Sequence, residues 1–147
     1  MSIQDKLLED MKKAMKSKEK AKLSVIRMAR AEIKDAEINE RKDLSDDEII
    51  EVLSRLVKQT KESLSEFKKA GDEERVAKAK QEIKILKNYL PAQLSKEELA
   101  KLVKETISDL GAEDMSDMGQ VMGAIMPQVK GRADGNQVNK LVRERLQ

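Results

Sequence analysis

Residues 45–71 of the chain read SDDEIIEVLSRLVKQTKESLSEFKKAG, and this stretch holds the clearest helix signal of the sequence. Ser45 followed three residues later by Glu48 is the pattern of a capping box, and the acidic residues between them suit the positive end of a helix dipole. Apolar side chains then recur at steps of three and four from Ile49 onward, as on one face of an α-helix. The run stops at Gly71, so the pattern predicts one long amphipathic helix.

Two further helices are predicted on the N-terminal side of this stretch. Ser2 with Asp5 three residues later is the signal of a helix start, and an apolar stripe continues from it. The first helix is expected at about residues 3–17, and the second is expected to end near Glu40. Their apolar stripes contain Ile3, Leu7, Leu8, Met11 and Met15 in the first helix, and Leu23, Ile26, Ile33 and Ile38 in the second.

On the C-terminal side, Asp72 is placed to cap a fourth helix that runs as far as Leu90. Pro91 biases the residue before it away from the helical region, so the fourth helix is expected to end there. The hexapeptide at 89–94, YLPAQL, is interpreted as a fixed corner between two domains, because it has no flexible run of Gly and Ser. Long helices joined by short loops indicate an antiparallel bundle over residues 1–90.

The remaining residues predict three shorter helices. Ser95 is placed to start a helix that ends at Gly111, Ser116 is expected to cap a methionine-rich helix, and Asp134 is placed to cap the last one. No stretch shows the alternation of a strand. The predicted fold class is therefore all-α, with an N-terminal long-helix bundle and a small C-terminal three-helix domain at residues 95–147.

The composition excludes several kinds of active site. The 147 residues include no Cys and no His, which removes disulfides, zinc–thiolate sites and serine–histidine catalysis. The acidic cluster at 46–51 has the spacing of a helix start, so neither a metal nor a cofactor is expected. The first 13 residues lack the apolar core of a signal peptide, and no stretch is apolar enough to span a membrane. These features predict a cytoplasmic protein without a membrane segment.

The formal net charge of +2 hides a segregation of charge along the chain. Residues 1–30 carry a net charge of +5, residues 31–51 carry −6, and residues 128–147 carry +3. Basic stretches attract nucleic acids, although charged side chains are equally typical of solvated helix faces. Phe67 and Tyr89 are the only aromatic residues, too few to stack bases. Any bound nucleic acid is therefore expected to be a folded RNA, recognised by its shape and phosphates.

The turn at residues 130–135, KGRADG, is the best candidate for a binding site. Glycines let a backbone present its N–H groups outward, and the N-terminus of a helix adds a partial positive charge. Asp134 opposes an anion and has a simpler role as the cap of the last helix, so phosphate binding and plain capping both stay open. The candidate phosphate-binding residues are Lys130, Gly131, Arg132, Gly135 and Arg143.

A second candidate surface lies on the methionine-rich helix. Gly119 and Gly123 are one helical turn apart and leave a strip of backbone that another helix, or a partner protein, can approach closely. Packing inside the domain explains this spacing as well as partner binding does. The four methionines of this region are interpreted as flexible filler of a small core, and an adaptable binding surface is the alternative.

Four segments together resemble the YqeY family. They are LSVIRM at 23–28, NYLPAQL at 88–94, MGQVMG at 118–123 and KGRADG at 130–135. They occur in the order and at the spacing of that family and cover nearly the whole chain. The last two also resemble the C-terminal tail domain of GatB, the B subunit of the glutamine-dependent aspartyl/glutamyl-tRNA amidotransferase.

The resemblance implies a two-part helical fold and a link to tRNA, because the GatB tail contacts tRNA. The family is often labelled as a carbon–nitrogen ligase with glutamine as amido-N-donor, but no catalytic residue of the family carries over to this chain. The first hypothesis is therefore a non-catalytic tRNA-associated module. The alternatives are a protein-interaction module that docks on an amidotransferase or another translation protein, and an amido-transfer enzyme. The sequence leaves the oligomeric state open.

Overall fold

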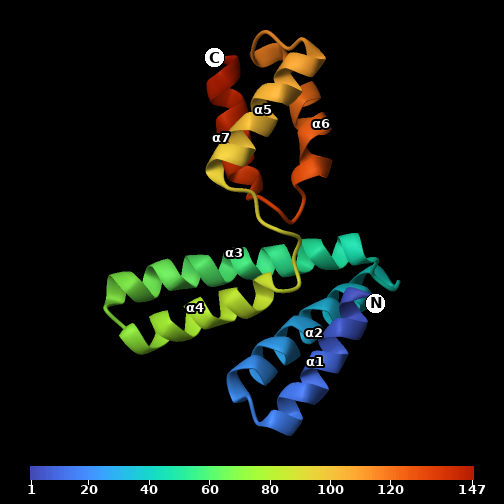
Figure 1. The fold of residues 1–147 in the computed structure, drawn as a ribbon, viewed down its shortest axis with the longest axis vertical. Helices are drawn as coiled ribbons and strands as arrows, with labels where there is room; N and C mark the ends of the chain where they lie inside the picture. Colours follow the sequence, from blue (N-terminus) through green and yellow to red (C-terminus); the bar gives the residue numbers. More distant parts are fainter. The chain divides into compact units, whose positions relative to one another are not determined.

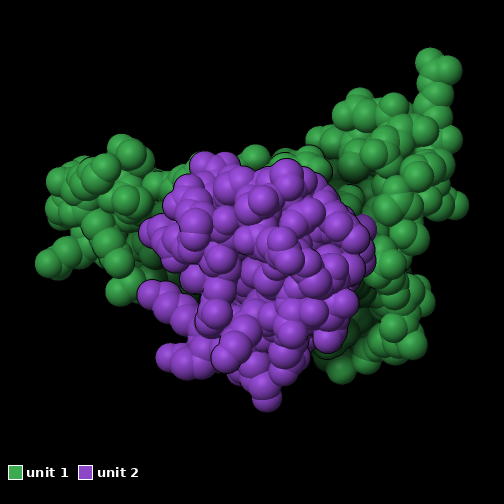
Figure 2. Space-filling view, turned by 90° about the horizontal axis from the view of Figure 1, so that it is seen from above, with its two compact units in different colours: residues 1–90 green, residues 91–147 purple.

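The computed structural model describes residues 1–147 and contains α-helices, one short 3-10 helix and no strand, so the predicted all-α class is confirmed (Figure 1). The chain forms two compact units, unit 1 at Met1–Leu90 and unit 2 at Pro91–Gln147 (Figure 2). The helices are α1 (Ile3–Ser17), α2 (Lys20–Glu40), α3 (Asp46–Ala70), α4 (Glu73–Lys87), α5 (Lys96–Leu110), η1 (Met115–Asp117), α6 (Met118–Val129) and α7 (Gly135–Leu146).

The helix starts of unit 1 follow the capping signals of the sequence. The Ser45 hydroxyl accepts a hydrogen bond from the Glu48 N–H at 3.3 Å, and the Glu48 carboxylate accepts one from the Ser45 N–H at 3.2 Å. The Ser2 hydroxyl likewise accepts from the Asp5 N–H at 3.1 Å. Each of these contacts satisfies a backbone donor that has no partner within the helix. The predicted starts of α1 and α3 are therefore confirmed.

Unit 1 consists of two helical hairpins, α1–α2 and α3–α4, that share one core (Figure 1). Two residues of the predicted stripes lie outside this core, since Met15 is 51% exposed and Ile38 is 63% exposed. The stripe of α1 continues through Ala14, which is fully buried, instead of Met15. Ile38 lies five residues after Ile33, a step that rotates it by about 140° to the outer face of α2. The largest buried side chains of unit 1 are Leu7, Ile26, Ile49, Leu53 and Leu86.

The end of α4 differs from the sequence-based prediction. The helix stops at Lys87, three residues earlier than expected. The side chain of Tyr89 turns into unit 1, where it is 6% exposed and its hydroxyl donates a 2.5 Å hydrogen bond to Asp10 of α1. The ammonium group of Lys6 lies 5.5 Å from the centre of the Tyr89 ring. Burial and the neighbouring carboxylate raise the pKa of the Tyr89 hydroxyl, so it stays a donor. This contact fixes the end of unit 1 to its first helix.

Unit 2 packs α5, α6 and α7 around a small core rich in valine. The predicted cap of the methionine-rich helix is wrong, because Ser116 lies inside η1 and α6 begins at Met118. The carboxylate of Asp114 accepts the Ser116 N–H at 2.9 Å and thereby starts the short helix instead. Aspartate side chains readily form such local turns with a backbone N–H two residues ahead. The buried core residues of unit 2 are Leu99, Val103, Val121, Ile125, Val129, Val138, Val142 and Leu146.

Candidate nucleic-acid interface

The turn between α6 and α7 closes on itself through backbone hydrogen bonds. The N–H groups of Arg132 and Ala133 both donate to the carbonyl of Val129, at 2.8 and 3.1 Å. Gly131 has a φ of 73°, in the left-handed region that glycine adopts without steric cost. The amides of 132 and 133 are thus already bonded within the chain and do not face an anion.

Asp134 occupies the N-terminus of α7. Its carboxylate accepts a hydrogen bond from the Asn136 N–H at 2.9 Å, as the capping interpretation predicts. A carboxylate at this place opposes a second anion at the same N–H groups. The N-terminus of α7 is therefore occupied by the protein's own negative charge, and any phosphate contact has to come from side chains further along.

Three hydrogen bonds join the turn to residues 92–94, and we call this set the brace. The Gln93 side-chain amide donates to the Gly131 carbonyl at 2.6 Å, and the Leu94 N–H donates to the Arg132 carbonyl at 2.9 Å. The Arg132 Nε donates to the Ala92 carbonyl at 3.2 Å. The turn is consequently a fixed part of unit 2. The Nε donor of Arg132 is engaged in this contact with Ala92.

The role of Gln93 was missed in the sequence. Gln93 and Gly131 are 38 residues apart, and helical periodicity reports only neighbours along one helix. Both residues do lie in stretches that interrupt the helical pattern, at 89–94 and 130–135. This shared break in the helical pattern is the one sequence feature that could have indicated their contact.

The last helix presents polar and charged side chains to solvent, Glu144 among them. Asn136, Lys140 and Arg143 are exposed and lie at steps of four and three, on one face of α7. Lys130 and Arg132 are half-buried in the turn. Of the predicted phosphate-binding residues, Arg143 is therefore the exposed cation, whereas Gly131 and Arg132 shape the turn.

The face of α6 that carries Gly119 and Gly123 is open. A Cβ atom added at either glycine would meet no other atom within 4 Å, so no helix of the chain packs against them. Residues 118–129 contain no charged residue, in a chain of which 39% of residues are charged. Packing inside the domain therefore does not account for the two glycines.

The methionines of this region divide into two pairs. Met118 and Met122 pack against the core of unit 2, as core filler should. Met115 is 39% exposed and Met126 is 36% exposed, so the prediction of a core role is wrong for this pair. The Met126 methyl group lies 3.5 Å from the place of a Cβ at Gly135, which lets this side chain lie over the start of α7.

The acidic cluster at the start of α3 has structural roles. Lys42 pairs with Glu48 at 2.8 Å, and this ion pair together with the Ser45 N–H lowers the pKa of the Glu48 carboxyl to about 2. Asp46 accepts a hydrogen bond from the Ile3 N–H at 3.2 Å and so ties α1 to α3. No group of three or more Asp or Glu residues is arranged to hold a metal ion.

Comparison with known proteins identifies the family. The sequence profile described as Yqey-like protein matches residues 4–146. The chain belongs to the YqeY family. A protein of Pyrenophora tritici-repentis named altered inheritance of mitochondria protein 41, mitochondrial, is 32% identical over 143 residues, which are 95% of this chain and 78% of that protein.

Proteins of the same name in two other fungi match a shorter part of this YqeY-family chain. The Kluyveromyces lactis protein is 40% identical over 87 residues, 58% of this chain and 47% of its own length. The Eremothecium gossypii protein is 38% identical over 97 residues, 64% of this chain and 53% of its own length. The matches thus span about half the length of these two relatives.

The expectation of a cytoplasmic location is contradicted by these comparisons. The relatives are named as mitochondrial proteins, which is opposed to the location inferred from composition and from residues 1–13. Composition and the residue types at 1–13 describe the chemistry of a chain, and they do not distinguish one aqueous compartment from another. None of the helices combines the length and the apolar composition that a membrane span requires.

Proposed function

We propose that this YqeY-family chain is a non-catalytic module that contacts folded RNA, with tRNA as its first candidate partner, through α7 of unit 2. The observation that carries the proposal is the row of Asn136, Lys140 and Arg143 on the exposed face of α7. Lysine and arginine side chains at this spacing can contact neighbouring phosphates of one backbone.

The brace gives this surface a fixed base. Arg132 and Gly131 hold residues 92–94 against the turn from which α7 starts, so the first turn of α7 has little freedom to move. A fixed surface loses less entropy on binding than a mobile one. In this proposal Arg143 contacts phosphate, while Arg132 positions the helix that carries it.

The kind of RNA recognition follows from the residues that unit 2 lacks. Both aromatic residues of the chain, Phe67 and Tyr89, lie in unit 1, so unit 2 offers no ring on which a base could stack. Contacts to phosphates and to the shape of a folded RNA are what its surface supports. The resemblance of residues 118–135 to the tRNA-contacting tail of GatB favours tRNA over other folded RNAs.

A titration of tRNA at low salt tests the proposal. The paired substitutions Lys140→Gln and Arg143→Gln should weaken binding about tenfold and make the salt dependence less steep, because two phosphate contacts are lost. The control pair, Lys101→Gln and Lys104→Gln, removes the same charge from exposed positions on α5 and should change affinity less than about twofold. Equal losses in both pairs, or no binding by the unmodified chain, would contradict the proposal.

The second candidate function is docking on an amidotransferase or another translation protein. The open, uncharged face of α6 around Gly119 and Gly123 favours it, because solvated helices of this chain otherwise carry charges. A pull-down with the purified chain should then recover a translation protein, and Gly123→Leu should abolish its capture. Recovery that is insensitive to Gly123→Leu would exclude this face as the docking site.

A further inference from the structure

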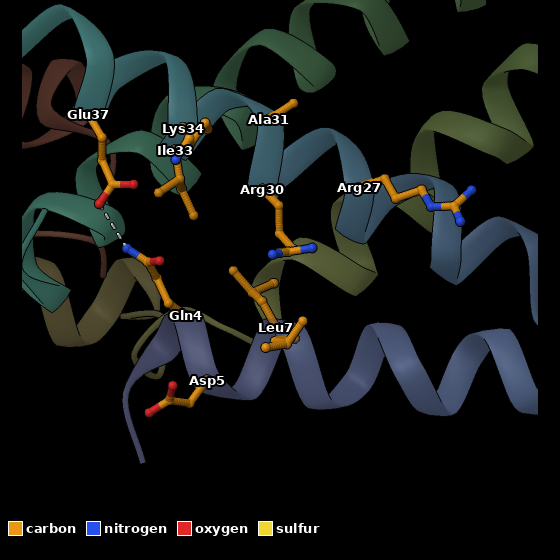
Figure 3. Close-up of a pocket in the computed structure, with 10 residues that line it drawn as sticks. Gln4, Asp5, Leu7, Arg27, Arg30, Ala31, Ile33, Lys34 and Glu37 are labelled. Atoms are coloured by element: carbon orange, nitrogen blue, oxygen red, sulfur yellow. Dashed lines mark hydrogen bonds between the residues drawn. The ribbon is translucent and has the colours of Figure 1, made fainter. Parts of the chain in front are cut away.

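A groove between α1 and α2 of unit 1 has no role in the proposal above. It encloses about 480 Å³ and is lined by residues from both helices (Figure 3). Its apolar side is formed by Leu7, Leu8, Ala31 and Ile33. Its basic side is formed by Arg27, Arg30 and Lys34 of α2. The lining of the groove therefore combines apolar side chains with three cations.

The three cations of the groove have no acidic partner. Other basic residues of the chain do form ion pairs, as Lys13 does with Glu9 and Lys42 does with Glu48. In contrast, the guanidinium of Arg30 donates to the thioether sulfur of Met11 at 3.1 Å, and thioether sulfur is a weak acceptor. Figure 3 shows this guanidinium reaching from α2 toward α1. Arg30 is thus held in the groove with its strong donors unused.

The acids that line the groove lie at one end and are engaged there. The Glu37 carboxylate accepts hydrogen bonds from the Leu44 N–H at 3.0 Å and from the Gln4 side chain at 3.2 Å. Figure 3 shows the bond between Gln4 and Glu37 at one end of the groove, away from Arg27. Asp5 also lines this end, in the first turn of α1. Lys34 lies toward this end, whereas Arg27 lies at the other end, where none of the acids that line the groove is drawn (Figure 3).

We propose that this groove binds a chain of phosphate groups. Arg27, Arg30 and Lys34 lie on one face of α2 and span about 10 Å along the helix, enough for successive phosphates rather than one small anion. Guanidinium groups pair with phosphate oxygens in a two-pronged geometry, and the phosphate would replace Met11 as the acceptor for Arg30. Arg27 is exposed and points along α2, so its side chain can swing toward a bound phosphate (Figure 3).

The test uses inorganic triphosphate as the probe and the full chain labelled with ¹⁵N. Backbone amide shifts during the titration should cluster at residues 4–11 and 27–37, and the affinity should fall as salt is added. The triple variant Arg27→Gln, Arg30→Gln and Lys34→Gln should weaken triphosphate binding about tenfold or more. Shifts scattered over all basic residues, or no shift at millimolar triphosphate, would overturn the proposal.

A matched variant controls for charge. Lys58→Gln, Lys61→Gln and Lys68→Gln remove three exposed cations from α3 and should change triphosphate affinity less than about twofold. Met11→Leu keeps an apolar residue and removes only the sulfur acceptor, so it should leave binding intact or strengthen it and should not abolish it. Equal weakening by both triple variants would show nonspecific attraction and would contradict a built groove.

A second titration distinguishes the two sources of a phosphate chain. A short RNA oligomer that displaces triphosphate from the groove would indicate an RNA backbone as the occupant. An oligomer that leaves the triphosphate shifts unchanged would indicate a free oligophosphate or nucleotide. The groove belongs to unit 1, so this result stands independently of tRNA binding by α7. If the groove proposal fails, triphosphate causes no amide shifts in unit 1. If the RNA proposal fails, tRNA causes no change at α7 in unit 2.

Discussion

The two units of this chain pack their helices around cores of different residue types. Unit 1 is the larger and buries mainly leucine and isoleucine, with Leu53 and Ile26 fully covered. Unit 2 is smaller, and five of its eight buried core residues are valines, with smaller side chains than leucine. It adds the brace, which fixes an irregular turn through Gln93 and Arg132. A smaller unit buries a smaller share of its chain's surface, so its core contributes less to stability.

The surfaces of the two units differ as well. In unit 1, α2 separates a basic groove on the α1 side from a largely acidic groove on the α3 side. In unit 2, α6 carries no charge, and α7 places Lys140 and Arg143 on one exposed face. The near-neutral total of +2 therefore describes neither unit's surface. Charge in this chain is therefore segregated helix by helix.

The largest expected effect concerns the core of unit 1. Leu53→Ala removes a fully buried side chain from α3 and should lower the free energy of unfolding of unit 1 by about 3 kcal/mol. Urea denaturation followed by helical circular dichroism measures the change. Ile38→Ala is the control, because its side chain is 63% exposed and its loss should cost less than about 0.5 kcal/mol. Similar losses for the two variants would contradict the described core.

The next effect is a gain in stability in unit 2. Gly119→Ala and Gly123→Ala place a methyl group in open space on α6, where alanine is the better helix former. Each should raise the stability of unit 2 by about 0.5–1 kcal/mol. Thermal unfolding of the single and double variants measures the gain. A loss of stability would show that these glycines are needed for packing within the chain.

A loss of similar size is expected at the brace. Gln93→Ala removes the 2.6 Å hydrogen bond to the Gly131 carbonyl and should cost about 1 kcal/mol. Hydrogen exchange should become faster at the Leu94 amide and in the turn, but not in α3. Gln128→Ala is the control, since its side chain is exposed and bonds only within α6. Unchanged exchange at residue 94 would show that the brace does not restrain the turn.

The smallest effect concerns acid. Because Lys42 and Ser45 lower the pKa of Glu48 from 4.5 to about 2, the folded state favours the ionised carboxyl. The resulting stability is present above pH 4.5 and is lost as pH falls toward 2. Glu48→Gln should therefore flatten the fall in stability of unit 1 over this range, measured by unfolding at several pH values. High salt should diminish the difference, because the pair is solvent-exposed. An identical acid profile for both proteins would contradict the pairing.

The fold was largely predictable from the sequence because its signals are local. The Ser45 capping box, the stripe of α3 and the end at Gly71 each depend on residues within a few turns of one helix. The errors arose where neighbouring residues compete for one position on a helix face or for one cap. Ala14 is buried in the core where Met15 was predicted to be. Asp114 caps the short helix, whereas Ser116 was predicted to act as a cap.

The candidate site was less predictable than the fold. The composition of the turn at 130–135 located an irregular, basic segment, but it did not reveal that Gln93 from 38 residues earlier is bound to it. Helical spacing placed Gly119 and Gly123 on one face, yet the sequence could not show whether a helix covers that face. Both questions concern contacts between elements, which periodicity along one helix does not report.

Hydrogen–deuterium exchange of the full chain, with and without tRNA at low salt, is the decisive test of the proposed contact between RNA and the exposed face of α7. If unit 2 contacts RNA there, tRNA should slow exchange in residues 130–146, and Lys140→Gln with Arg143→Gln should remove this protection. An exchange pattern of α7 that is identical with and without tRNA would contradict the claim.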